Sequence, residues 1–350
     1  MQMKAVTVAR PEIDRRRLYT QQRWEALDYL ARTHFESSAV QGRAMIYVTG
    51  SLARGEATEG SDMDLFVADC LNIVKDCASS NPNCDHLNYV DTAGLVHRLD
   101  QVRHDAGFRA FSRGGEFIRT HHLSRLVELM GDPLDDAENA FTARILLLIN
   151  SRSLWNQEAY VEARQRILDA YWKLQESKAD FHPILLMNDL RRWWSVLCLN
   201  FERYNKRQVV DDYSAKSPAS RRIANLKLRY ARMIAAFTPI LLLIDGSDEL
   251  GRVSRESVES ILSASPVERL EALERDGRDA RTRELAGTVL DRYDSYLILM
   301  RDPESAVSRL VVDESKWREI KTEAYDFHAD FSSLYRSVGS DRLLYEYAQI

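Results

Sequence analysis

The sequence has no long apolar run and no apolar leader, and these absences exclude whole classes of protein. The longest apolar stretches, such as 145–149 and 239–244, are far shorter than the roughly 20 residues of a membrane-spanning helix. The first residues, MQMKAVTVARPEIDRRR, lack the continuous apolar core of a signal peptide. We therefore expect a cytoplasmic protein with no membrane partner.

Cysteines are few, and no block of basic charge is present. The four cysteines form no close Cys-x-x-Cys pair, so reduced thiols are a better interpretation than a structural zinc site. The formal net charge of −5 disfavours a chain that binds nucleic acid over its whole surface, although a local basic face stays open. The hydrophobic share of 45% is enough to bury a sizeable core in 350 residues.

The N-terminal part has alternating helix and strand signals. Apolar residues at helical spacing predict a helix over 11–35, with Pro11 in its first turn. Short β-branched and aromatic runs predict strands at 44–49 and 63–68, and Ser51 is a candidate N-cap for one or two helical turns between them. We further expect a loop over 70–84, a helix over 92–103 and a third strand at 116–119.

After 131–133 (Gly-Asp-Pro) the pattern becomes helical and strand signals are few. Apolar residues recur at three- and four-residue spacing in several segments, namely 138–151, 155–178, 184–206, 219–244 and 314–336. The sequence therefore predicts an α+β protein. We expect a small α/β unit over residues 1–130 and a larger all-helical domain over 131–350.

The stretch at 49–69, TGSLARGEATEGSDMDLFVAD, combines features that suit phosphate chemistry. Asp62 and Asp64 fall in a predicted strand, where residues i and i+2 point the same way with Cα atoms roughly 6.5–7 Å apart. Two carboxylates so placed can share a divalent cation, and oxygen-rich sites suit Mg²⁺. Gly50 lets a ligand approach the backbone closely, and the amides and hydroxyl at Ser51 favour a phosphate.

Taken together, the stretch resembles the nucleotidyltransferase signature of the DNA polymerase β-like superfamily. That signature is an apolar strand, Gly-Ser, about ten residues, and Asp-apolar-Asp-apolar; here it reads Gly50-Ser51, then Asp62-Met63-Asp64-Leu65. Arg54-Gly55 and Ser61 match the wording common in bacterial members. The resemblance is specific over 44–69 only, and it implies a small mixed sheet with helices in 1–130 and a helical domain over 131–350 that caps the nucleotide and acceptor cleft.

The resemblance implies transfer of a nucleoside monophosphate from an NTP, ATP among them, to an acceptor hydroxyl, with release of pyrophosphate. Gly50, Ser51, Arg54 and Ser61 would hold the nucleotide, and Asp62 and Asp64 would hold Mg²⁺, with Mn²⁺ as an alternative. A third carboxylate on a later strand usually completes such a site as metal ligand and catalytic group. Our candidate is Glu116, with competitors Asp85, Asp91, Asp100 and Asp105.

Basic residues of the helical part are candidates for triphosphate contacts. In this superfamily a helical domain often caps the nucleotide, and Arg192 and Lys227 are our choices, the alternative being a solvated basic face. Lys227 shares its predicted helix with Arg229 and Arg232. The pair Trp193-Trp194 is more typical of a core than of a base-stacking platform. We expect His121 and His122 to follow the third strand as surface or interdomain residues.

The acceptor stays open between a protein side chain, an RNA end, a small molecule and a second nucleotide. An alternative in another class is an NTP-binding regulatory or toxin–antitoxin-type protein with the same fold and little catalysis. A third interpretation is a helical scaffold in which 49–69 matches by chance.

Overall fold

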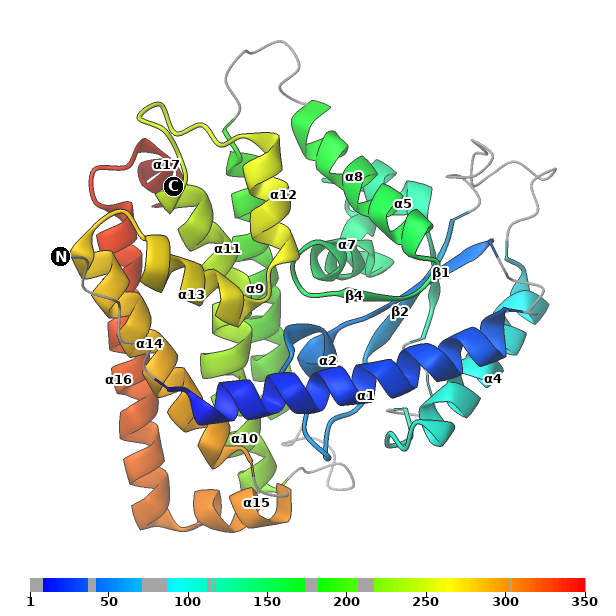
Figure 1. The fold of residues 1–350 in the computed structure, drawn as a ribbon, viewed down its shortest axis with the longest axis horizontal. Coiled ribbons are helices and arrows are strands. Elements are labelled where there is room, and N and C mark those ends of the chain that lie inside the picture. Colours follow the sequence, from blue (N-terminus) through cyan, green and yellow to red (C-terminus); the bar gives the residue numbers. More distant parts are fainter. Residues whose placement is uncertain are drawn as a thin grey trace.

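The computed structural model describes residues 9–36, 42–70, 87–111, 115, 118–173, 182–206, 217–301 and 304–349. It combines a small sheet, built largely from the N-terminal part, with a larger set of helices that follows it. This arrangement confirms the predicted α+β class (Figure 1). In the described parts of the chain, no helix is both long and apolar enough to cross a membrane.

The sheet is mixed and has four strands in the order β3-β2-β1-β4. Strand β1 (Ala44–Val48) runs antiparallel to both β2 (Leu65–Asp69) and β4 (Arg152–Trp155), and β2 runs parallel to β3 (Thr120–His122). Val48 pairs with both Leu65 and Arg152. The end of β1 and the starts of β2 and β4 therefore lie at one end of the sheet.

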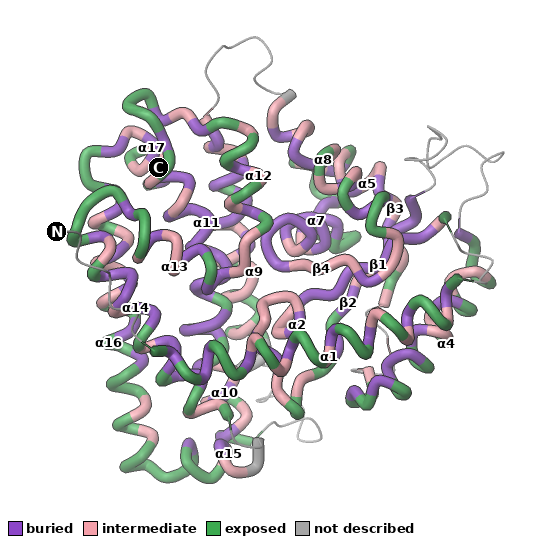
Figure 2. Tube along the Cα trace, in the orientation of Figure 1, coloured by how far each residue is buried: buried purple, intermediate pink, exposed green. Residues whose placement is uncertain are grey.

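The two faces of the sheet enter two different cores. Ile46 and Val48 of β1 pack with α1 (Pro11–Phe35) and α4 (Tyr89–Asp105), whereas Met45 and Tyr47 belong to the large core of the helical part. Successive residues of a strand point to opposite faces, which explains why all five residues of β1 are buried. Figure 2 shows the buried strands between the half-exposed helices that cover them.

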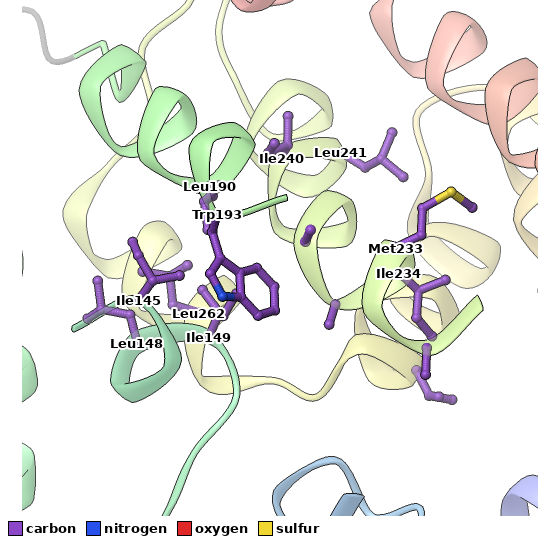
Figure 3. Packing of buried hydrophobic residues seen from close by; sticks show 14 of the residues in the cluster. Ile145, Leu148, Ile149, Leu190, Trp193, Met233, Ile234, Ile240, Leu241 and Leu262 are labelled. Carbon is purple, nitrogen blue, oxygen red and sulfur yellow. The ribbon is translucent and has the colours of Figure 1, made fainter. Parts of the chain in front are cut away.

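The helical part begins with the short helices α5 (Leu123–Glu128) and α6 (Leu134–Ala137). Longer ones follow: α7 (Ala140–Ile149), α8 (Gln157–Lys173), α9 (Ile184–Lys206), α10 (Pro218–Lys227), the π-helix η3 (Leu228–Arg232), α11 (Met233–Asp245), α12 (Arg255–Ser263), α13 (Pro266–Asp276), α14 (Ala280–Leu299), α15 (Glu304–Val312), α16 (Glu314–Gly339) and α17 (Leu343–Gln349). Around Trp193, side chains of α7, α9 and α11 pack into one apolar core (Figure 3).

Helix α1 ties the sheet unit to the helical part. Arg10, just before α1, forms ion pairs with Glu274 of α13 and Asp291 of α14, at 2.7 and 2.9 Å. Asp294 of α14 accepts the backbone N–H groups of Glu12 and Ile13 at the start of α1. These bonds stabilise α1 across both parts, so the first helix does not belong to the sheet unit alone.

The helices at 11–35 and 184–206 have the predicted bounds, and α4 includes the helix predicted at 92–103. Several strand details were wrong. β2 begins at Leu65, two residues late, and β3 occupies 120–122 rather than 116–119, so His121 and His122 lie within it. The position N-terminal to α2 (Gly50–Arg54) is Thr49, not Ser51.

A fourth strand, β4, lies beyond residue 130 and was not predicted. It has four residues and one fully buried apolar side chain, Leu154, so it carries almost no alternation that a sequence pattern can detect. Its place depends on pairing with β1. The domain boundary near 130 stays a prediction, and the loop predicted over 70–84 lies, beyond Cys70, outside the described residues.

Candidate active site

The Gly-Ser turn and the two aspartates meet at one end of the sheet. Val48 pairs with Leu65, and the next residue, Thr49, donates its backbone N–H to the carbonyl of Asp64 at 2.8 Å. The chain then turns into the short helix α2, which ends at Gly55 in a left-handed conformation. Pairing of two antiparallel strands therefore brings together residues that lie 14 positions apart, Gly50 and Asp64.

Gly50 is required for two separate reasons. Its φ angle is +69°, in the left-handed region that other residues enter at a cost. A Cβ atom at this position would also lie 2.7 Å from Oδ2 of Asp64. The missing side chain thus lets the Asp64 carboxylate lie directly against the turn.

Asp62 and Asp64 point to the same side of the chain. They precede β2 rather than lying in it, but Met63 between them is buried whereas both acids are exposed and line one cavity. Although Asp64 is open to this cavity, protein surrounds it closely. Burial, and next the negative charge of Asp62, raise the pKa of the Asp64 carboxyl to about 6. The repulsion is what a bound cation would relieve.

The residues present fit a divalent cation, because two carboxylates for which the described contacts give no ion pair line one cavity beside the Gly50 turn. Within the described ranges no group of three or more His, Cys, Asp or Glu is close enough to hold a metal. Glu116, our candidate for a third carboxylate, lies outside the described residues.

Hydroxyl groups link the turn to the segment before the aspartates. Ser51 Oγ donates to Ser61 Oγ at 3.1 Å, and Ser61 Oγ accepts the backbone N–H of Thr58 at 2.9 Å. Both serines line the cavity. This short chain of hydrogen bonds holds the start of α2 and the approach to Asp62 in a fixed relation.

The cavity has a volume of about 1040 Å³ and lies between the sheet end, α1, α7, α9, α10–α11 and α14. Its basic lining residues come from both parts of the chain: Arg15, Arg16, Arg54, Arg109, Lys227, Arg232 and Arg301. The volume is at the upper end of the range for small-molecule sites. It leaves room for more than one reactant.

Several of these cations are already neutralised by acids of the protein. Glu12 binds Arg15, Arg16 and Arg301 at 2.7 to 2.9 Å. Burial opposes ionisation of Glu12, but hydrogen bonds from Arg15 and Arg16 outweigh it and lower its pKa to about 2. In the absence of ligand, these arginines are therefore already paired with a carboxylate of the protein.

Arg54 is held in a buried network. Its Nε donates to Glu56 Oε2 at 2.6 Å, and Tyr293 of α14 donates its hydroxyl to the other oxygen of Glu56 at 2.7 Å. The network positions Arg54 between the aspartates and the helical part. Its guanidinium is close enough to Asp64 to lower the pKa of that carboxyl, against the larger effect of burial.

Lys227 and Arg232 differ from the other cations, because neither has an ion pair or hydrogen bond to protein among the described contacts. Both also act electrostatically on Asp64. Burial, and then the like charge of Arg54, lower the pKa of Arg232. Two cations without a described ion pair thus lie in the same cavity as two carboxylates that repel each other.

The π-helix η3 explains how both side chains reach the cavity. In an α-helix a residue five positions on is rotated by roughly 140°. In η3 the turn is wider, with the backbone N–H of Met233 bonded to the carbonyl of Leu228, five positions back. This widening moves Arg232 toward the face that carries Lys227. A change of helix type at this point is a frequent mark of functional sites.

The structure thus brings Gly50, Ser51, Arg54, Ser61, Asp62, Asp64 and Lys227 to one cavity. Arg192 is not in its described lining. It binds Asp136 at 2.6 Å and lies over the ring of Phe141, 4.1 Å from the centroid, so it holds α9 against α6 and α7. Arg232, which the sequence places on the same helix as Lys227, is a cavity residue that was not among our candidates.

Comparison with protein families agrees with the resemblance. The family model for the nucleotidyltransferase domain matches residues 34–68, which include the Gly-Ser turn and both aspartates. No match was found among curated proteins. The segment that forms the sheet end of the cavity is therefore similar to a nucleotidyltransferase domain, and this similarity supports nucleotidyl transfer as the general activity.

Proposed function

We propose that the protein is a Mg²⁺-dependent nucleotidyltransferase that uses an NTP and an acceptor hydroxyl. The acceptor oxygen forms a bond to the α-phosphorus of the NTP, the bond from that phosphorus to the bridging oxygen breaks, and pyrophosphate leaves. One observation carries the proposal. Asp62, Asp64 and the Gly50 turn line the same cavity as Lys227 and Arg232, for which the described contacts include no ion pair or hydrogen bond to protein.

Asp62 and Asp64 would hold the metal ion, which supplies positive charge to the phosphate oxygens and to the attacking hydroxyl. The hydroxyls of Ser51 and Ser61, which line the cavity beside the Gly50 turn, can turn from each other toward the phosphate oxygens. Glu116 remains our proposed third carboxylate, which would accept the acceptor's proton.

Lys227 and Arg232 would neutralise the triphosphate. Phosphoryl transfer depends mainly on positioning and charge neutralisation. A cation that already has a carboxylate partner must give it up to bind phosphate, whereas Lys227 and Arg232 lose no such contact. Arg54, held by Glu56, would add positive charge near Asp64.

The acceptor hydroxyl belongs to a protein, an RNA end, a small molecule or a second nucleotide, and we propose a cytoplasmic enzyme. The runner-up, a regulatory NTP-binding protein, would keep the nucleotide site without needing the pair of metal-binding carboxylates. The presence of both acids in one cavity favours the enzyme.

The test uses the full chain with Mg²⁺ and each of the four NTPs labelled on the α-phosphate, with and without cell extract. We expect label on one acceptor and stoichiometric pyrophosphate, and neither with Asp64→Asn. NTP binding with no labelled product in any arm would support the regulatory protein, and absence of NTP binding would exclude both.

A further inference from the structure

The cavity has two chemically different parts. The sheet end and the π-helix side carry the acids and cations described above. The side formed by α7 and α9 has none, and we call it the uncharged lobe; it consists of Asn139, Thr142, Leu146, Asn150, Trp193 and Leu197. Spacings of three and four residues place the α7 members on one face of that helix. Trp193 enters from α9 through the apolar core drawn in Figure 3.

Asn150 is the unusual residue of the uncharged lobe. It ends α7, is 6% exposed, and its backbone N–H donates to the carbonyl of Leu146. Its side-chain Oδ1 is buried without a hydrogen-bond partner in the protein. An unsatisfied buried polar atom costs roughly 1–3 kcal/mol. One atom of this buried amide is therefore available to a ligand.

The uncharged lobe adjoins the reacting end of the cavity. Asn150 comes two residues before Arg152 of β4, which pairs with Val48 of β1. Val48 in turn comes two residues before Gly50 and pairs with Leu65, the neighbour of Asp64. The same end of the sheet therefore holds Asn150, Gly50 and Asp64, each within two residues of the end of one of three neighbouring strands.

We propose that the uncharged lobe binds the nucleobase of the NTP, and that the Asn150 amide hydrogen-bonds to the edge of the base. The inference rests on the proposed function. A nucleoside triphosphate has one polyanionic end and one uncharged, flat end, and the cavity is divided in the same way. A side-chain amide matches any base edge that presents a donor beside an acceptor. Leu146, Leu197 and Trp193 supply apolar surface for the ring.

The test measures binding to the full chain in Mg²⁺ by calorimetry. The probes are the α,β-methylene analogues of ATP, GTP, CTP and UTP, in which the bond that would break is blocked, and inorganic tripolyphosphate. We expect wild type to bind at least one analogue more tightly than tripolyphosphate. Asn150→Leu should weaken that analogue about 10-fold or more, as expected for a loss of about 1.4 kcal/mol, and leave tripolyphosphate within about twofold.

Two further variants guard against a structural explanation. Thr238→Val is the matched control, because Thr238 is fully buried on α11 with an equally unsatisfied hydroxyl, yet it is absent from the described lining of the cavity. It should leave all affinities unchanged. Asn150→Ser serves if Asn150→Leu does not fold. Melting temperature should not fall in Asn150→Leu, since an unsatisfied polar atom is replaced by an apolar group.

The outcomes separate the inference from the proposed function. Equal losses of affinity for the analogue and tripolyphosphate would mean that Asn150 only supports the site. No loss of affinity for either probe would mean that the uncharged lobe binds the acceptor instead. Either result overturns the inference. Wild type that binds analogues no better than tripolyphosphate also overturns it, while the proposed function stands. Wild type that binds no probe would overturn both.

Discussion

The two sides of the cavity are encoded in different ways. On the sheet side, the turn at Gly50 and the acids at 62 and 64 lie within one stretch of the chain, and one pair of antiparallel strands brings them together. On the helical side, Lys227 and Arg232 come from a helix more than 150 positions later and reach the site through a π-helix. The first side can be found as a motif, whereas the second exists only in the folded chain.

A second contrast lies among the cations themselves. Arg15, Arg16 and Arg301 share one buried acid, Glu12, whereas the contacts described for the chain give Lys227 and Arg232 no ion pair. Lining a cavity is therefore not the same as being available to a ligand. The first group joins α1 to the rest of the protein, whereas Lys227 and Arg232 can bind an anionic ligand.

The largest expected effect tests the sheet side. Asp64→Asn should lower the rate of nucleotidyl transfer by about 10³-fold or more, because a metal clamp loses a ligand and each 1.36 kcal/mol is tenfold in rate. The fold should persist, since the substitution removes a carboxylate that burial and Asp62 already disfavour. Labelled-NTP turnover and thermal melting measure the two effects.

The matched variant is Asp276→Asn, which changes an exposed carboxylate at the end of α13. It should retain wild-type turnover. If Asp64→Asn and Asp276→Asn were equally active, the two-carboxylate site would not be where transfer occurs.

The next effect compares free with paired cations. Arg232→Gln should lower kcat/KM about 10- to 100-fold, because it removes a charged hydrogen bond to the triphosphate in a partly enclosed site. Arg301→Gln, a cavity residue bound to Glu12, should lower it less than about threefold, because Arg15 and Arg16 continue to neutralise Glu12. Steady-state kinetics at fixed Mg²⁺ would measure kcat/KM for both variants. Similar losses in the two would mean that cations with and without a protein carboxylate contribute equally.

Much of the fold and half of the site could be predicted from sequence for one physical reason: local periodicity. The apolar spacing of helices such as α1 and α9 lies within one segment, and so does the spacing of the motif. The strands β3 and β4 have three and four residues and are ordered by their neighbours, so no local pattern marks them. Arg192 shows the same limit, because helical spacing cannot tell which neighbour a basic face will meet.

A smaller effect separates the two reasons for glycine at position 50. Gly50→Ala should cost roughly 1–2 kcal/mol of stability from its left-handed backbone and also lower turnover about 10-fold, because the new Cβ would displace the Asp64 carboxylate. Gly42→Ala is the control: its φ is +78°, but a Cβ there would have no neighbour within 4 Å. It should share the loss in melting temperature and keep full activity. Equal activities would show that Asp64 adjusts freely.

The smallest effect on transfer concerns the far edge of the sheet. His121 of β3 is buried against Phe66, at 5.8 Å between ring centroids, and it is not in the described lining of the cavity. Burial, then the charge of Arg119, lower its pKa from 6.5 to about 4; His122 acts in the same direction and Glu138 opposes them. Because the unfolded chain binds this proton more readily, folding stability should fall as pH drops from about 6.5 to about 4.

His121→Phe keeps a ring against Phe66 and removes the titration, so its melting temperature should lose less than that of wild type over the same pH window. At pH 7.5, where the native histidine is neutral, the variant should transfer nucleotide at the wild-type rate. If the melting temperatures of the two proteins fell equally from pH 7.5 to 4.5, His121 would not be a buried neutral histidine. If His121→Phe instead changed turnover at pH 7.5, this edge of the sheet would influence the reaction. The residues that act in transfer would then not be confined to the cavity that Asp64 and Arg232 line.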